Sequence, residues 1–211
     1  MMKKSVLLVS FILGVFISLN SAAQNREQDL ARYVDPFWGA GEDWWTGGHT
    51  FAGVTVPFGM VKLGPDCNEK NNNSGYDRNG KVHGFSHVHV SGSGGNPKYG
   101  NILVMATTGD LKVTDYGSDR ENETSKPGLF SVDYTGYDIR AELTATHSVG
   151  MHRYRFNRGG KSNILFDLGS YLTWVDDEWT QEFVGSEIRF ISDRELQGYS
   201  RIRKGWGKGD A

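Results

Sequence analysis

The clearest hydrophobic and polar pattern in the chain is a strict alternation over residues 139–146. Its apolar members are Ile139, Ala141, Leu143 and Ala145, and its polar members are Arg140, Glu142, Thr144 and Thr146. Because successive side chains of a strand point to opposite faces, a period of two predicts a strand with one buried face and one face in water. Gly150 and the segment 151–156 follow, so a hairpin is expected there.

Further short apolar segments predict further strands between polar or glycine-rich turns. The expected strands are residues 102–106, 129–134, 163–168, 187–191 and 199–202, of which the first four are expected to be buried. Residues 54–63 predict an irregular or edge strand because Pro57 and Gly59 interrupt them. Residues 26–32 predict one short helix before Pro36. Successive strands with short turns indicate an all-β, mostly antiparallel β-sandwich.

The first residues of the chain have the organisation of a secretory signal peptide. A basic start with Lys3 and Lys4 precedes an apolar run over residues 6–19 and the small residues 21–23. Residues 1–23 are therefore expected to be removed, which leaves a domain at residues 24–211. The apolar run is shorter than the ~20 residues of a membrane span, so an exported protein with no membrane partner is expected, either periplasmic or extracellular.

Charge and cysteine content exclude two classes of protein. The formal net charge is −2, whereas a nucleic-acid partner requires a concentrated basic surface. Cys67 is the only cysteine, so no disulfide can form within the chain and packing must stabilise the exported protein.

Residues 84–95 are the richest in candidate chemistry, with two histidines, three serines and four glycines. In an extended strand His87 and His89 would project to the same face, and His-x-His is a spacing used by zinc and other metals. The alternative is that these imidazoles bind hydroxyls, backbone or a sugar. We favour the structural or sugar-contacting interpretation and predict no metal ligand. A histidine-based metalloprotein is kept as a less favoured hypothesis for the function of the chain.

Two further loops carry groups suited to sugars. Tyr76 beside Asp77 offers a ring for the apolar face of a sugar and a carboxylate for its hydroxyls, although an Asx turn explains the same pair. His49 follows Trp44 and Trp45 in a second loop, which is either a binding surface or a cap on the core. No pair of carboxylates suggests a glycosidase acid and base, so no catalytic residue is predicted.

Several motifs together resemble one family. They are YVDPFWG at residues 33–39, GHTFAGV at 48–54, VPFGMVKLGPD at 56–66, the segment 84–92, YGNIL at 99–103, AELTAT at 141–146, GMHRY at 150–154 and ILFDLG at 164–169. In combination these are similar to the N-terminal domain of glycoside hydrolase family 92, the calcium-dependent exo-α-mannosidases common in Bacteroidetes. The resemblance covers nearly the whole chain after residue 23.

The resemblance implies a β-sandwich of the galactose-mutarotase-like, or supersandwich, type followed by a larger (α/α)6 catalytic domain. It implies that calcium and the catalytic carboxylates come mainly from that second domain, which the chain is expected to lack. The substrate contacts implied by motif position are Tyr76, Asp77, His49, His87 and His89, facing mannose-containing glycans such as N-glycans.

Two functions follow as expectations. The first is the mannoside-binding N-terminal domain of a secreted α-mannosidase, which would cleave terminal α-mannosyl linkages only when joined to its catalytic domain. The second is a free-standing carbohydrate-binding protein without hydrolytic activity. Because the chain ends soon after a predicted strand, at residues 204–211, we also expect it to be incomplete.

Overall fold

The computed structural model describes residues 29–40, 50–67, 74–90, 99–172 and 181–204. The chain divides into two units, Met1–Tyr33 and Val34–Ala211. In the described part of the first unit, a short 3-10 helix, η1, covers Leu30–Tyr33. In place of the helix expected at 26–32, the described residues form this shorter 3-10 helix, which begins later in the chain. Residues 26–28 lie outside the described residues. No helix among the described residues is long and apolar enough to cross a bilayer.

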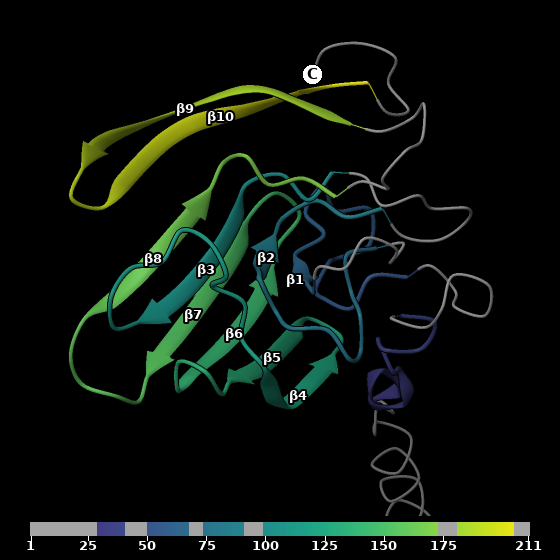
Figure 1. Cartoon of the computed structure of the whole chain (residues 1–211). Helices are drawn as coiled ribbons and strands as arrows, with labels where there is room; N and C mark the ends of the chain where they lie inside the picture. The colour runs from purple at the N-terminus through teal and green to yellow at the C-terminus, as the bar shows by residue number, and fades with distance from the viewer. Residues whose placement is uncertain (1–28, 41–49, 68–73, 91–98, 173–180, 205–211) are drawn as a thin grey trace, which may run out of the picture. The chain divides into compact units, whose positions relative to one another are not determined.

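The second unit is built from antiparallel strands (Figure 1). They are β1 (Gly64–Asp66), β2 (Gly84–Ser86), β3 (Leu103–Thr108), β4 (Arg120–Lys126), β5 (Leu129–Tyr134), β6 (Ile139–Ala145), β7 (Gly150–Phe156), β8 (Ser162–Asp167), β9 (Glu182–Ser192) and β10 (Glu195–Arg203). One sheet has the order β1-β2-β3-β8 and the other the order β4-β5-β6-β7, while β9 and β10 pair as a hairpin. This is the all-β, antiparallel sandwich that the sequence predicts.

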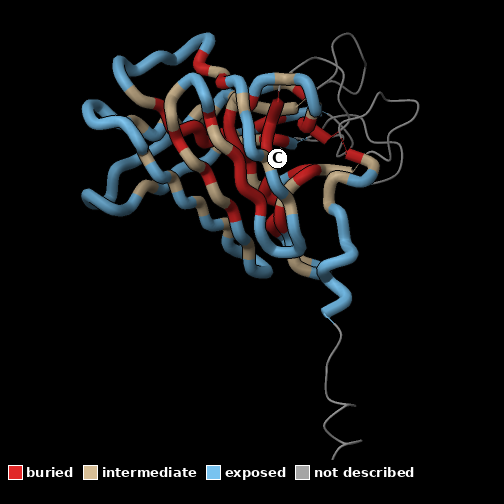
Figure 2. Tube along the Cα trace, turned by 90° about the horizontal axis from the view of Figure 1, so that it is seen from below, coloured by how far each residue is buried: buried red, intermediate tan, exposed pale blue. Residues whose placement is uncertain are grey.

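Aromatic side chains join the two sheets in the core. Phe85 of β2 lies 6.0 Å edge-to-face from Phe130 of β5 and 5.9 Å from the stacked ring of Tyr134, measured between ring centroids. All three side chains are fully buried. Figure 2 shows the buried stretches of neighbouring strands lying side by side, with exposed loops around them. Aromatic packing of this kind adds to the stabilisation from apolar burial.

The strands β5, β6 and β7 form where the sequence predicts them. In β6, Ile139, Ala141 and Leu143 are at most 1% exposed, which confirms the predicted apolar face. β8 and β9 also form, but the side chains of β8 alternate between exposed and intermediate, and residues 187–191 of β9 are exposed or intermediate. The prediction of buried strands at 163–168 and 187–191 was therefore wrong. Within the described part of the chain β8 pairs with β3 alone and lies at the edge of its sheet, which leaves Ile164 and Phe166 partly in water.

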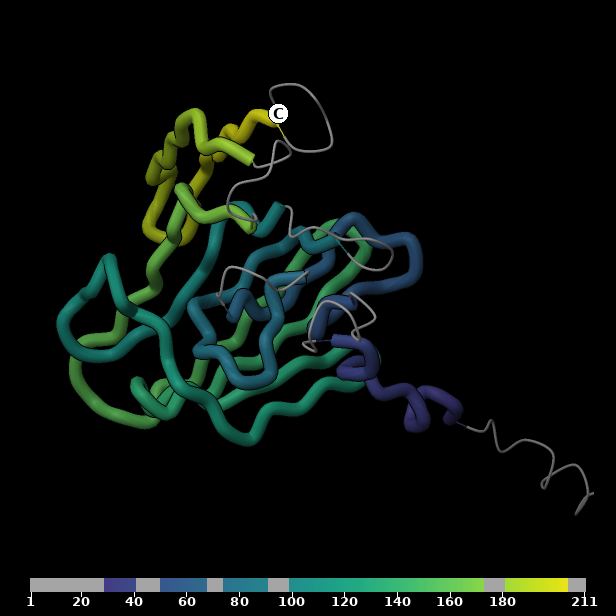
Figure 3. Tube along the Cα trace, turned by 45° about the vertical axis from the view of Figure 1, so that its right-hand side comes forward, coloured from purple at the N-terminus to yellow at the C-terminus, as the bar shows by residue number. Residues whose placement is uncertain are grey.

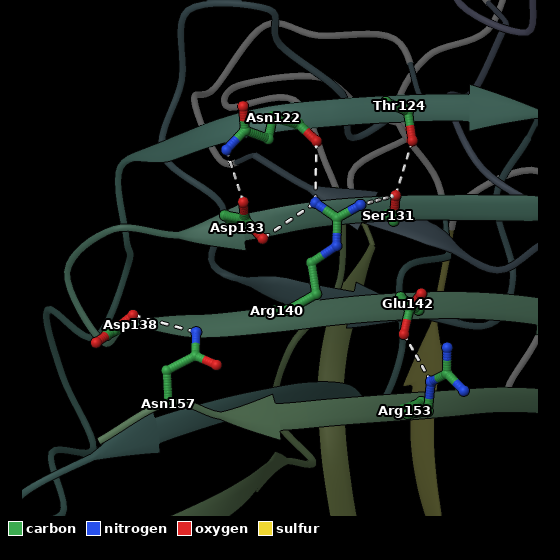
Figure 4. Close-up of polar contacts among 9 residues, drawn as sticks. All are labelled: Asn122, Thr124, Ser131, Asp133, Asp138, Arg140, Glu142, Arg153 and Asn157. Carbon is green, nitrogen blue, oxygen red and sulfur yellow. Dashed lines mark hydrogen bonds and ion pairs between the residues drawn. The ribbon is translucent and has the colours of Figure 1, made fainter.

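The outer face of the second sheet is held by a polar ladder (Figure 4). The Arg140 guanidinium on β6 donates to the Ser131 hydroxyl at 2.6 Å and to Asp133 Oδ1 at 3.0 Å, both on β5. It also donates to the Asn122 carbonyl of β4 at 3.1 Å. One planar fork therefore links three neighbouring strands, as guanidinium geometry allows.

Two segments differ from their sequence predictions. Residues 54–63 do not form a strand; they make one isolated bridge, between Val54 and Leu63. β4 was missed because its sequence, RENETSK, has no apolar side chain that marks a buried face. The hairpin of β9 and β10 is tied to the first sheet by the Ser200 hydroxyl, which donates to the Leu168 carbonyl at 2.7 Å.

Candidate functional site

Described segments that are far apart in sequence meet at one end of the sandwich. The backbone N–H of Gly100 donates to the Val88 carbonyl at 3.0 Å, and that of Leu172 donates to the Tyr99 carbonyl at 2.7 Å. The segments 50–67 and 74–90 lie at the same end, around β1 and β2 (Figures 1 and 3). This convergence makes the end of the sandwich the candidate site.

A buried ion pair lies at the centre of this end. His89 Nε2 is 2.7 Å from Asp66 Oδ1, and His89 Nδ1 is 2.8 Å from the Lys62 carbonyl oxygen. A carbonyl and an ionised carboxylate can only accept, so opposite ionised Asp66 both ring nitrogens donate and the imidazole carries the positive charge. Burial opposes this charge, but the Asp66 carboxylate, its hydrogen bond and the Lys62 carbonyl outweigh burial and raise the pKa of His89.

The ion pair is closely packed from two sides. The Phe51 ring stacks on the His89 imidazole, with 5.6 Å between centroids and 4° between planes. Gly75 has a φ of 83°, and a Cβ there would lie 2.5 Å from Asp66 Oδ1. Only glycine allows the backbone to take this left-handed conformation so close to the carboxylate. The geometry of Asp66 is therefore fixed by its surroundings.

Two buried polar atoms at this end have no hydrogen-bond partner within the described part of the chain: Asp66 Oδ2 and Asn101 Nδ2. The backbone beside Asn101 is strained, because Tyr99 has a φ of 67° and Ile102 a φ of 59°. A left-handed conformation is costly for a β-branched residue such as Ile102. Buried groups without partners and local strain are both more frequent at functional sites than elsewhere.

His87 belongs to a different contact from His89. Its Nε2 atom lies 3.1 Å from Nε2 of His152 on β7, and His152 Nδ1 lies 2.9 Å from the Tyr154 hydroxyl. The two histidines of the His-x-His motif therefore bond to separate partners. β2 ends at Ser86, so the alternation of side chains along an extended strand does not continue through the motif.

Tyr76 lies in a buried cluster with Glu123 and Arg120 of β4. Its ring is 3% exposed, its hydroxyl donates to Glu123 Oε2 at 2.8 Å, and the Arg120 guanidinium lies 5.0 Å from the ring centroid. Asp77 accepts the backbone N–H of Asn79 at 2.7 Å, which is the Asx turn that the sequence left open. His49 lies outside the described residues. Substrate contact by Tyr76, Asp77, His49, His87 and His89 stays a prediction.

Cys67 contributes no nucleophile in this cluster. Burial raises the pKa of its thiol to about 12, and Arg120 Nη1 donates to the sulfur at 2.6 Å. A thiol with so high a pKa carries almost no thiolate at neutral pH. Its role is packing.

Sequence reasoning missed three residues of these contacts: Asp66, Asn101 and His152. All three belong to family motifs given above, but no role was assigned to them: Asp66 ends VPFGMVKLGPD, Asn101 is in YGNIL and His152 is in GMHRY. The signal that could have found Asp66 is the apolar surroundings of its carboxylate, in the run that ends LGPDC.

Comparison with known proteins places the fold in a family. Residues 33–211 match the family model described as the glycosyl hydrolase family 92 N-terminal domain. The solved α-mannosidase of family GH92 from Bacteroides thetaiotaomicron, in complex with mannoimidazole, is 28% identical, with a TM-score of 0.73 over 84% of this chain and 24% of that one. A GH92 family glycosyl hydrolase, ccman5, shares the fold with a TM-score of 0.66, at 24% identity over 84% of this chain and 25% of that one.

An "uncharacterized secreted glycosidase" of Arthroderma benhamiae is 32% identical over 173 residues, which are 74% of this chain and 22% of that protein. The chain belongs to the glycosyl hydrolase family 92 N-terminal domain family. It spans about a quarter of the length of the relatives it matches.

Proposed function

We propose that this chain is the sugar-contacting N-terminal domain of a secreted α-mannosidase, which removes terminal α-mannosyl residues from glycans together with a catalytic domain. The family match over residues 33–211 carries the proposal. It is supported by the α-mannosidase relative from Bacteroides thetaiotaomicron, whose structure was solved with mannoimidazole.

The chemistry of the described residues suits positioning better than catalysis. Inverting glycosidases place two carboxyl groups about 6.5–9.5 Å apart, one as acid and one as base. At the candidate end, Asp66 is held in an ion pair with His89, so it is not available as a proton donor. Its role in the proposal is to hold the segments around β1 in a fixed geometry against which a sugar binds.

Calcium enters the proposal only through the second domain. Calcium takes six to eight oxygen ligands. The described residues contain no cluster of three or more histidine, cysteine, aspartate or glutamate side chains that could hold a metal ion. The donor set of this part of the chain does not fit calcium, and no step of the proposal passes through it here.

The test separates this proposal from a free-standing carbohydrate-binding protein. Purified protein is titrated with mannose, with glucose as the matched control, and is separately incubated with α-1,2-mannobiose and calcium. We expect weak mannose binding at most and no hydrolysis. Hydrolysis at ordinary enzyme rates, roughly 1–1000 per second, would show that the chain is a complete enzyme. Tight, mannose-selective binding by a folded monomer would favour the free-standing protein.

A further inference from the structure

The contact between His87 and His152 connects the two sheets of the sandwich at their margin. His87 follows β2 of the first sheet, and His152 lies in β7, an edge strand of the second. Their Nε2 atoms are 3.1 Å apart and their ring centroids 4.9 Å apart. Both residues are of intermediate burial.

The separation of the two nitrogens matches that of two ligands on one metal ion. Zinc binds imidazole nitrogen at about 2.0–2.1 Å with tetrahedral angles, which places neighbouring ligand atoms about 3.3 Å apart. The observed 3.1 Å between the two Nε2 atoms is close to this value. A metal ion could therefore be accommodated by a small outward movement of either ring.

The surroundings hold both rings in the required orientation. The Tyr154 hydroxyl lies 2.9 Å from Nδ1 of His152, so the far side of that ring has the hydrogen-bond partner that metal-binding histidines usually have. A Cβ at Gly150 would lie 2.4 Å from Cδ2 and 2.7 Å from Nε2 of His87. The bare backbone at Gly150 thus makes room for the His87 imidazole.

We propose that His87 and His152 bind one divalent transition-metal ion of the zinc type through their Nε2 atoms, linking the two sheets. Imidazole suits zinc, copper and nickel, whereas calcium prefers oxygen ligands, so this site is separate from the calcium expected in the catalytic domain. The remaining coordination positions are taken by water, so the two imidazoles are the protein ligands of the site.

Metal binding by this histidine pair requires no release of a proton to solvent. In the metal-free pair, one ring carries a proton on Nε2 and the other accepts it. When a metal ion binds to both Nε2 atoms, that proton moves to Nδ1 of the same ring, and both Nε2 lone pairs point to the metal.

The experiment is a zinc titration of the full chain, purified without a polyhistidine tag, by calorimetry and by thermal unfolding. We expect about one equivalent of zinc to bind saturably and to raise the Tm, because a ligand that binds only the folded state stabilises it. Calcium at the same concentration should leave the Tm unchanged. His87→Gln and His152→Gln should each abolish the zinc effect, and Tyr154→Phe should weaken binding about tenfold.

His147→Gln is the matched control, since His147 is exposed and its imidazole hydrogen-bonds only to the Ser148 hydroxyl in the described structure. Zinc binding retained in both His87→Gln and His152→Gln, or absent from the wild type, would overturn the proposal. If a variant fails to fold, histidine-selective NMR of the wild type tests instead whether zinc binds to these two rings. Zinc must then perturb the ring signals of His87 and His152 and leave that of His147 in place.

Discussion

At the scale of single residues, the Asp66–His89 pair shows how a buried charge is tolerated. Asp66 and His89 are 4% and 1% exposed, so neither group is solvated by bulk water. Each charge is stabilised by the other, and the Lys62 carbonyl accepts the second imidazole proton. Removing one partner leaves the other buried and unpaired, which costs far more than the pair contributes over an apolar replacement.

Asp66→Asn is therefore expected to lower the free energy of unfolding by about 3 kcal/mol at pH 7. The matched control is Asp119→Asn, because Asp119 is exposed and 4.0 Å from Lys81, where an ion pair is worth at most about 1 kcal/mol. Urea denaturation followed by tryptophan fluorescence measures both variants. Equal losses in the two variants would mean that the buried pair has no special role in stability.

Glu123 is expected to change the stability of the protein with pH in the opposite direction to most carboxylates. Burial raises its pKa above the ordinary 4.5, although Arg120 and the Tyr76 hydroxyl act in the other direction. The folded carboxyl therefore binds its proton at a higher pH than the unfolded one. By linkage, this group adds stability as the pH falls through its folded pKa towards 4.5, and that contribution is lost as the pH rises again.

Glu123→Gln cannot titrate and removes this contribution. The free energy of unfolding of the wild type, minus that of the variant, should accordingly increase as the pH is lowered from 7 to 4.5. Urea denaturation at several pH values measures this difference. A difference that shrinks on acidification would show that the ion pair with Arg120, 3.3 Å away, dominates instead.

The grouping of residues that was predicted from the sequence was only partly correct. His87 and His89 were paired by the parity of an extended strand, but the strand ends before them and their rings bond to His152 and Asp66. A pattern in sequence predicts direction only while the backbone stays regular. Partners separated by 65 and 23 positions depend on the packing of the two sheets, which the local pattern does not contain.

At the scale of elements, strands with an apolar face were predictable and polar strands were not. β5 has the bounds expected from the sequence, and β6 ends one residue earlier. β4 carries seven polar residues and forms because β5 offers a neighbouring strand to pair with. Its register shifts between Glu121 and Thr124, beside Asn122 with a φ of 49°. This bulge accompanies the inward position of Glu123, which no local pattern indicates.

Gly150, at the start of β7, tests the contact between the sheets. A Cβ there would meet the His87 ring at 2.4 Å. Gly150→Ala is therefore expected to lower the free energy of unfolding by about 1–3 kcal/mol, as overpacking does. Gly159→Ala is the control, because a Cβ at Gly159 has no atom within 4 Å. Thermal and urea unfolding compare the two; a neutral Gly150→Ala would show that His87 moves aside freely.

At the scale of the molecule, the chain matches about a quarter of each relative. Several large apolar side chains on the sheet edge and the hairpin are exposed, among them Phe166, Phe190 and Tyr199. Isolated exposed apolar residues are ordinary, but an edge strand and a two-stranded hairpin with several of them provide surface that a second domain could cover. The proposed mannosidase function requires a second domain of this kind, because the proposal assigns positioning to this chain and the acid–base pair to the catalytic domain.

A chimera tests whether this domain can serve a family 92 catalytic domain. The part of the Bacteroides thetaiotaomicron α-mannosidase that matches this chain, about a quarter of its length, is replaced by residues 33–211, and the rest of that enzyme alone is the control. Since the two N-terminal domains share the fold with a TM-score of 0.73, we expect the chimera to hydrolyse an α-mannoside at least about tenfold faster than the control. With 28% identity the surfaces that meet the catalytic domain differ in many side chains, so activity below that of the intact relative is also expected. A folded chimera no more active than the control would show that this domain does not complete a mannosidase site.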